Sequence, residues 1–368
     1  MSQPKPRVAV VFGGRSSEHA ISCISAGSVL KAIDRTKYDV VPIGITTDGR
    51  WVLENPGTNL LELGPAGELP SVTGSTEVAI GSGQEIIAHP PGSFPETLGQ
   101  VDVVFPVMHG PWGQDGTLQG LLEMAGVRYV GAGVLSSAVG TDKVFMKRLF
   151  EAQGLPVLPY VVITQRSWSM DQPAVRARIE GLGLPLFVKP ARAGSSFGIS
   201  RVDTLDKLDD AIAEARRFDP KVVVEAAAVH AREIECGVLQ GLGDEPHATS
   251  ELAEIRVDPH HQFYDFEAKY LPEENTALDV PASVEPALAA TIRGLAAQAF
   301  DALDCEGLAR VDFFVFPDGR VVVNEVETMP GFTSLSMFPR MWAASGVDYP
   351  ELVDRLIRLA LARDIGLR

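Results

Sequence analysis

The chain has 368 residues and a formal net charge of −16 at pH 7. This length exceeds what one ordinary hydrophobic core accommodates, so two or three domains are expected. The negative charge would repel a phosphate backbone over most of the surface, which argues against nucleic acid as a partner. Hydrophobic residues make up 45% of the chain, yet no apolar run approaches the roughly 18 residues that span a bilayer. We therefore expect no membrane partner.

The N-terminus and the cysteines indicate the compartment. The opening sequence MSQPKPRVAV has neither a long apolar core nor a small-residue cleavage site, so we expect no export. Cys23, Cys236 and Cys305 lie far apart and form no CxxC or Cys/His cluster. Buried free thiols in a reducing cytoplasm are the expected state.

Residues 7–33 predict a strand, a glycine-rich turn and a helix, which open an α/β domain. The Gly-Gly pair at 13–14 lacks the GxGxxG spacing of a dinucleotide site, so a nicotinamide cofactor is only weakly indicated. Residues 16–18, Ser-Ser-Glu, follow the carboxyl end of the strand, where open parallel sheets bind ligands. A helix cap would explain the same residues, and both interpretations stay open. Residues 54–100 predict an irregular or hairpin excursion.

Two further stretches carry candidate site residues. The apolar run 101–110 predicts a buried parallel strand that ends in His109, which would point into a crevice or serve as a structural histidine. Residues 136–154 predict one helix, with Lys143 and Lys147 one turn apart.

Residues 189–202, KPARAGSSFGISRV, combine small residues with Lys189 and Arg192. Small residues let a backbone approach phosphate closely, although a surface hairpin would have a similar composition. The Walker A pattern GxxxxGK[ST] is absent. Residues 260–275 are polar and lack a clear period, which indicates a mobile active-site loop.

An Asp-Gly pair at 318–319 joins two apolar runs and predicts a β-hairpin with a two-residue turn. Counting outward pairs four charged residues on one face: Asp312 with Glu325, and Arg310 with Glu327. Six residues would form a largely apolar opposite face: Val311, Phe313, Val315, Val322, Asn324 and Val326. Paired carboxylates repel each other unless a cation lies between them, and a hard cation such as Mg²⁺ prefers such oxygens. The alternative is a solvated acidic face with an Arg310–Glu327 ion pair.

Seven motifs, in this order and spacing, resemble those of the D-alanine–D-alanine ligases of the ATP-grasp superfamily: GGRSSEHAIS, HGPWGQDGTLQG, TDKVFMK, VKPARAGSSFGIS, YDFEAKYL, GLARVDFF and NEVETMPGFTSLSM. The resemblance spans nearly the whole chain. It implies an α/β fold with a Rossmann-like substrate-binding domain (1–132), a central domain (133–225) and a C-terminal domain (226–368) with a mobile loop at 255–276. ATP would lie between the antiparallel sheets of the second and third domains.

The family's reaction is also implied by this resemblance. ATP phosphorylates the carboxylate of one D-alanine, and the amine of a second D-alanine attacks the acyl phosphate to give a dipeptide for peptidoglycan synthesis. ATP is thus a substrate, and two Mg²⁺ ions, or Mn²⁺ in their place, are the implied metals. A homodimer formed through the first domain is the implied assembly.

The resemblance assigns roles to sixteen residues. The implied ATP contacts are Lys143 and Lys189 at the phosphates, Glu225 at the adenine amine, Glu233 at the ribose and Lys269 at the γ-phosphate. The implied metal ligands are Asp312, Glu325 and Glu327. The implied catalytic groups are Arg310 and the Gly331 N–H at the oxyanion, and Glu18 at the substrate ammonium, with Ser195 and Tyr270 bonded to Glu18. The implied substrate contacts are His109 for the first D-alanine and Ser336 and Met337 for the second.

One residue departs from the family pattern, which usually has Asn where this chain has Glu327. A carboxylate also binds Mg²⁺, so we expect metal binding to survive. Two other functions compete with a dipeptide ligase. A D-alanine–D-lactate ligase is disfavoured by Tyr270, and a non-catalytic nucleotide-binding protein is disfavoured by the presence of Lys269 and Arg310.

Overall fold

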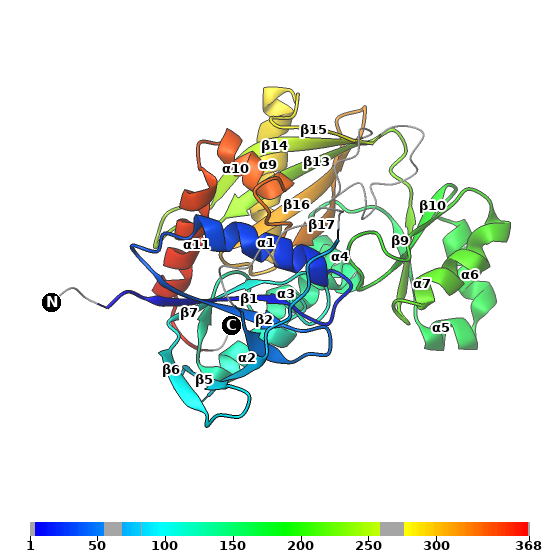
Figure 1. The fold of residues 1–368 in the computed structure, drawn as a ribbon. Coiled ribbons are helices and arrows are strands. Elements are labelled where there is room, and N and C mark those ends of the chain that lie inside the picture. Colours follow the sequence, from blue (N-terminus) through cyan, green and yellow to red (C-terminus); the bar gives the residue numbers. More distant parts are fainter. Residues whose placement is uncertain (1–3, 55–67, 82, 258–275, 367–368) are drawn as a thin grey trace.

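The computed structural model describes residues 4–54, 68–81, 83–257 and 276–366. Within these residues the chain forms three sheets (Figure 1). An eight-stranded sheet has the order β6-β5-β4-β3-β2-β1-β7-β8, a four-stranded sheet the order β11-β10-β12-β9, and a five-stranded sheet the order β15-β14-β13-β16-β17. The sheets follow one another along the chain, and the domain boundaries inferred from the sequence stay a prediction.

The first sheet contains eight strands: β1 (Arg7–Gly13), β2 (Asp39–Ile45), β3 (Trp51–Leu53), β4 (Thr76–Ile80), β5 (Glu85–His89), β6 (Glu96–Gln100), β7 (Val103–Val107) and β8 (Arg128–Tyr129). β1 pairs in parallel with β2 and β7, as their apolar runs predict. β3 to β6 add antiparallel pairs, so the described part of the predicted excursion is a meander. α1 (His19–Ala32) and α2 (Thr117–Ala125) complete this region.

The second region carries the four-stranded sheet and its helices: α3 (Val134–Thr141), α4 (Lys143–Ala152), β9 (Tyr160–Ile163), α5 (Gln165–Met170), α6 (Gln172–Glu180), β10 (Leu186–Pro190), β11 (Ser200–Val202), α7 (Leu208–Arg216) and β12 (Val222–Ala226). The single helix predicted for 136–154 is wrong, because the chain breaks at Asp142. Its carboxylate accepts hydrogen bonds from the N–H groups of Val144 and Phe145 and so caps a new helix. This break places Lys143 at the first position of α4.

The third region holds the five-stranded sheet and three helices: β13 (Arg232–Leu239), β14 (Ala248–Val257), β15 (Thr276–Asp279), α9 (Pro286–Ala302), β16 (Leu308–Val315), β17 (Val321–Glu327), α10 (Met337–Ala344) and α11 (Tyr349–Ala362). The predicted mobile loop 255–276 therefore overlaps β14 and β15 at its two ends. The rest of that loop lies outside the described residues.

The β16–β17 hairpin confirms the predicted charge pairs but not the predicted turn. Phe316 N–H donates to Arg320 O, so the loop holds residues 317–319 rather than two residues. A bulge at Asn324 then adds one residue to β17, which restores the pairing of Asp312 with Glu325. The shift also changes the apolar face: Val321 and Val323 belong to the hydrophobic cluster beneath α9, whereas Val322 and Asn324 do not.

The core joins the ends of the chain. Residues of β1, α1 and β7 pack in one hydrophobic cluster with residues of α10 and α11, and α11 contacts β7 and β8 directly. A second cluster lies between α9 and the five-stranded sheet. The first and third regions are thus held together by buried apolar surface. None of the helices described here combines the length and the apolar character that crossing a membrane requires.

Candidate active site

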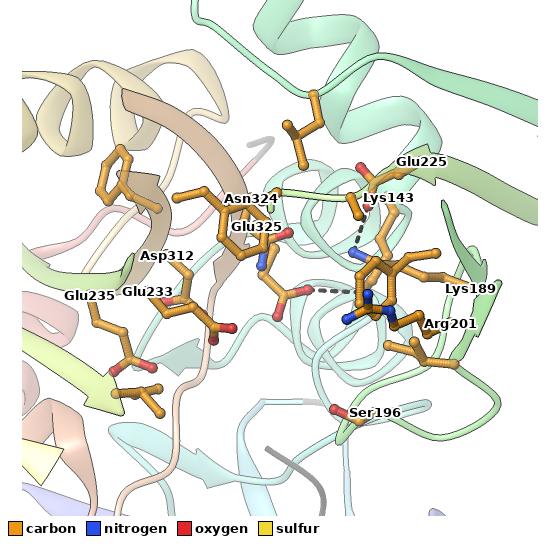
Figure 2. Close-up of a pocket in the computed structure, with 18 of the residues that line it drawn as sticks. Lys143, Lys189, Ser196, Arg201, Glu225, Glu233, Glu235, Asp312, Asn324 and Glu325 are labelled. Carbon is orange, nitrogen blue, oxygen red and sulfur yellow. Dashed lines mark ion pairs between the residues drawn. The ribbon is translucent and has the colours of Figure 1, made fainter. Parts of the chain in front are cut away.

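A cavity of about 470 Å³ opens between the four-stranded and five-stranded sheets (Figure 2). Its lining includes eight residues that the sequence singled out: Lys143, Lys189, Ser195, Glu225, Glu233, Arg310, Asp312 and Glu325. They come from both sheets, from α4 and from residues 191–199, here called the Gly-Ser loop, which connect β10 to β11. The structure therefore brings together side chains that lie up to 182 residues apart in the sequence, from Lys143 to Glu325.

The wall formed by α4 and the four-stranded sheet, here called the cationic wall, contains one buried carboxylate. Glu225 is 1% exposed at its side chain and forms ion pairs with Lys147, which is equally buried, and with Lys189 at 2.5 Å. Burial alone would raise the pKa of Glu225, but Lys147 and Lys189 lower it to about 2. Glu225 is therefore ionised, and both of its oxygens already face lysines.

The opposite wall, formed by β13, β16 and β17 and here called the acidic wall, contains a buried arginine. Arg310 donates two hydrogen bonds to Asp312, at 2.7 and 2.6 Å, and lies 3.4 Å from Glu235. Burial opposes the charge of Arg310, but Asp312 and then Glu235 hold its pKa well above the usual value. The alternative Arg310–Glu327 ion pair is not the observed pairing, although the two residues are cross-strand neighbours.

Lys143 connects the two walls. Its Nζ lies 2.9 Å from Glu325 Oε2 and within 3.4 Å of the Ala193 carbonyl in the Gly-Ser loop. Burial would lower the pKa of Lys143, but Glu325 raises it, so the ammonium is charged. Figure 2 shows Glu325 between the labelled lysines on one side and Asp312, Glu233 and Glu235 on the other.

Each of the three predicted metal ligands contacts a protein donor. Asp312 accepts from Arg310, Glu325 faces Lys143, and Glu327 accepts from Gln114. As placed, they do not form a coordination group, and the described residues hold no cluster of three His, Cys, Asp or Glu side chains that could bind a metal.

The chemistry of these donors nevertheless fits a divalent cation. Burial, and then the charge of Glu325, raise the pKa of Glu327 to about 7, although Arg310 and Lys143 act in the opposite direction. Neighbouring carboxylate oxygens in such a setting are the ligands that Mg²⁺ prefers.

A second group of predicted residues lies where the first region meets the Gly-Ser loop. Ser195 Oγ donates a hydrogen bond to Glu18, the residue that precedes α1. Glu18 also lies so close to Gly110 that a Cβ there would come within 2.3 Å of its carboxylate. Ser195 and Ser196 have φ values of +48° and +60°, a backbone region that non-glycine residues rarely adopt. This turn aims the serine hydroxyl at Glu18.

His109 is buried at the end of β7 and joins this group to the segment after β17. Its Nδ1 lies 3.2 Å from the Met329 carbonyl and its Nε2 lies 3.2 Å from Ser25 Oγ. Burial lowers the pKa of His109 although Glu18 opposes this effect. The ring is therefore neutral, with Nδ1–H as donor and Nε2 as acceptor.

The remaining predicted residues are less closely grouped. Gly331 follows Met329, and Ser336 precedes α10, where its Oγ accepts from Thr333 N–H at 3.1 Å. The Met337 side chain is buried in the cluster shared with the first sheet. Lys269 and Tyr270 lie outside the described residues.

Residues that were not predicted as site residues include Arg201 and Glu235, which line the cavity, Lys147, which pairs with Glu225, and Gln114, which bonds to Glu327. Two of them carried a usable signal. Glu235 follows Glu233 at the two-residue spacing that places strand side chains on one face. Glu225 interrupts an apolar strand, and a buried carboxylate needs a cation such as Lys147.

Comparisons with known proteins agree with this geometry. Models of the families described as D-ala D-ala ligase N-terminus and D-ala D-ala ligase C-terminus match residues 7–132 and 149–358. The D-alanine–D-alanine ligase of Arthrobacter sp. (strain FB24) is 57% identical over 369 residues, which cover 99% of this chain and 96% of the relative. That of Kineococcus radiotolerans is 57% identical over 377 residues and covers 100% of both.

Two solved structures resemble the whole fold. The VanG D-Ala:D-Ser ligase from Enterococcus faecalis superposes with a TM-score of 0.82 at 34% identity, covering 97% of this chain and 100% of that one. The D-alanine–D-alanine ligase from Coxiella burnetii gives 0.79 at 33% identity, with 97% and 94% covered. The chain belongs to the D-alanine–D-alanine ligase family and has its ATP-grasp fold.

Proposed function

We propose that this protein joins two D-alanine molecules to D-alanyl-D-alanine, a peptidoglycan precursor, with ATP converted to ADP and phosphate. The observation that carries the proposal is the cavity between two walls of opposite charge, with the Glu18–Ser195 pair beside it. Phosphoryl transfer requires positioned cations and acidic metal ligands on either side of a nucleotide tail. An amine-binding carboxylate at the edge of such a cavity suits an amino-acid substrate.

The cationic wall is assigned to the nucleotide. Lys143 and Lys189 would bind the phosphates, Glu225 would accept from the adenine amine and Glu233 would accept from the ribose hydroxyls. Glu225 is held ionised by Lys147 and Lys189, which suits an acceptor role. Lys269, outside the described residues, is assigned to the γ-phosphate on the strength of its motif alone.

The acidic wall is assigned to charge stabilisation. Asp312, Glu325 and Glu327 would hold Mg²⁺, which neutralises charge at the transferring phosphoryl group when bound. Arg310 is fixed by its two hydrogen bonds to Asp312, so its charge is already oriented before substrate arrives. With the Gly331 N–H, Arg310 would stabilise the oxyanion that forms when the amine attacks.

The substrates are assigned to the junction of the first region with the Gly-Ser loop. Glu18 would accept from the ammonium of the first D-alanine, in an orientation kept by Ser195 and, as its motif implies, by Tyr270. His109 would lie beside this substrate, while Ser336 and Met337 would line the second subsite. A neutral His109 presents one donor and one acceptor and adds no charge to this site.

Phosphate release from ATP, measured with a panel of D-amino and D-hydroxy acids from pH 6 to 9, tests the proposal. D-Alanine alone should support turnover and yield D-alanyl-D-alanine, because the same acid fills both subsites. D-Serine belongs in the panel because a solved relative is a D-Ala:D-Ser ligase. A clear preference for D-lactate or D-serine as second substrate would overturn the assignment, and ATP binding without phosphate release would support a non-catalytic binder.

We also propose a cytoplasmic homodimer. Leu121 and Met124 of α2 and Leu135 of the adjacent α3 are exposed, and exposed apolar side chains on neighbouring helices commonly mark an interface. Cys23, Cys236 and Cys305 are all free and buried, as expected in a reducing compartment. Sedimentation equilibrium should give twice the chain mass, and a Met124→Lys variant should shift it toward the monomer.

A further inference from the structure

The contact between Gln114 and Glu327 joins two distant parts of the chain. Gln114 lies in the loop between β7 and α2, and Glu327 is the last residue of β17. Gln114 Nε2 donates to Glu327 Oε2 at 2.9 Å, and Gln114 is only 9% exposed. The amide turns its NH₂ group, its only donor, toward a carboxylate oxygen that accepts.

The loop that carries Gln114 is held from several sides. The Gln114 carbonyl accepts from Thr141 Oγ1 at 2.9 Å, and its N–H donates to the Gly110 carbonyl at 3.1 Å. Gln119 Nε2 donates to the Gly113 carbonyl at 3.0 Å. Gly113 itself packs so closely that a Cβ there would come within 2.6 Å of the Met108 Cβ. The amide of Gln114 is therefore presented from a fixed backbone.

The same loop contacts the segment just after β17 at a second point. His109 contacts the Met329 carbonyl at 3.2 Å, two residues beyond Glu327. The loop thus fixes both the end of the strand and the carboxylate that projects from it. Without the amide, the hydrogen bond to the Glu327 carboxylate would be lost.

We propose that Gln114 is a positioning residue that holds the Glu327 carboxylate in the orientation needed to bind a divalent cation. The inference rests on the proposed function. It also accounts for the presence of Glu327 where the family usually has Asn, because the amide of Gln114 donates a hydrogen bond that stabilises the Glu327 carboxylate. A carboxylate at 114 would be compatible with an amide at 327, but not with Glu327.

A double-mutant cycle tests this coupling with four proteins: the wild type, Gln114→Glu, Glu327→Gln, and the two changes combined. Mn²⁺ binding is measured by electron paramagnetic resonance in the presence of a non-hydrolysable ATP analogue. Phosphate release with D-alanine is measured in parallel over a range of Mg²⁺ concentrations. The exposed Gln165→Glu variant on α5 controls for the added charge.

Gln114→Glu should weaken Mn²⁺ binding about tenfold and raise the half-saturating Mg²⁺ concentration by a similar factor, with little change in the KM for D-alanine. In the Glu327→Gln background, Gln114→Glu should change the Mn²⁺ affinity and the half-saturating Mg²⁺ concentration by less than about threefold. An amide and a carboxylate again face each other in this double variant. Gln165→Glu should change neither.

Equal effects of Gln114→Glu in both backgrounds, or no effect on Mn²⁺ binding in the wild type, would overturn the proposal. If Gln114→Glu does not fold, as judged by its thermal unfolding curve, Gln114→Met removes the donor without adding a charge and replaces it in the cycle. Failure of the proposed function is a separate result, in which the wild type releases no phosphate on addition of D-alanine.

Discussion

The two walls of the cavity hold buried charge in different ways. On the cationic wall, one carboxylate, Glu225, is enclosed by Lys147 and Lys189. On the acidic wall, one cation, Arg310, is enclosed by Asp312 and Glu235. Each wall thus carries an excess of one sign around a single counter-charge. A ligand that complements both walls must present negative groups to the cationic wall and a cation to the acidic wall. A nucleotide polyphosphate with its bound metal ion has this charge distribution.

Lys143 links the excess charges of the two walls. It crosses from the cationic wall to Glu325 of the acidic wall at 2.9 Å. Phosphate and a divalent cation would compete for the two ends of this ion pair. The comparison therefore predicts that Arg310 and Glu225, the counter-charges within each wall, contribute to the free energy of unfolding. The contacts that connect a wall to another part of the protein should affect mainly substrate binding.

The largest expected effect follows from removing the counter-charge of the acidic wall. Arg310→Met leaves Asp312 and Glu235 buried without their cation, which should lower the free energy of unfolding by about 3–5 kcal/mol. It should also reduce kcat by about 10² to 10³, the usual effect of losing an oxyanion contact. Urea unfolding and phosphate release measure the two effects.

Arg310→Lys and Arg217→Met sharpen this test. Arg310→Lys keeps the charge but loses the bidentate hydrogen bonds to Asp312. Relative to Arg310→Met, it should restore the free energy of unfolding more fully than kcat. Arg217 is exposed and its ion pair with Glu214 lies on the surface, so its loss should cost less than about 0.5 kcal/mol. Similar stability losses for Arg310→Met and Arg217→Met would contradict the charge balance described for this wall.

A pH-dependent effect is expected on the cationic wall. The pKa of Glu225 falls from 4.5 to about 2 on folding, so its contribution to stability is fully present above about pH 4.5 and is lost as pH falls through 2. The shift corresponds to a total on the order of 3 kcal/mol. Urea unfolding of the wild type and Glu225→Gln from pH 6 to 3 should show a stability difference that shrinks with acidification.

The exposed variant Glu214→Gln serves as the control, because its stability relative to the wild type should vary little with pH. A difference between wild type and Glu225→Gln that stays constant down to pH 3 would show that the two lysines do not lower the pKa of Glu225. The acidic wall would then be the only one in which buried charge is strongly coupled to folding.

The sequence predicted the acidic wall better than the cationic wall, and the reason is geometric. Strand pairing is local in a hairpin, so counting from the Asp-Gly turn placed Asp312 opposite Glu325. The count was correct only because the bulge at Asn324 compensates for the longer turn, and neither feature follows from a period-two pattern. Periodicity also does not predict the helix break at Asp142, because the residues on both sides of it are compatible with one continuous helix.

The cationic wall depends on contacts that no local pattern contains. Lys147 meets Glu225 across 78 positions of sequence, and at the acidic wall Gln114 likewise meets Glu327 across 213. The sequence indicates that a buried charge needs a partner, but the partner is chosen by the packing of separate regions. The resemblance to a family supplied the sixteen role assignments, and it did not indicate these supporting residues.

The smallest expected effect concerns the bond that leaves the cationic wall for the first region. Ser195→Ala removes the hydroxyl that donates to Glu18, while the Cβ and the left-handed backbone at +48° stay as they are. A hydrogen bond to a charged group contributes about 1.5–3 kcal/mol, so the KM for the first D-alanine should rise at least tenfold. The KM for ATP should change little, because Lys143, Lys189 and Glu225 keep their partners. Ser169→Ala, on the exposed side of α5, controls for a generic serine loss. Equal increases in both KM values would mean that Ser195 serves the nucleotide rather than Glu18, and the separation between wall contacts and substrate contacts would fail.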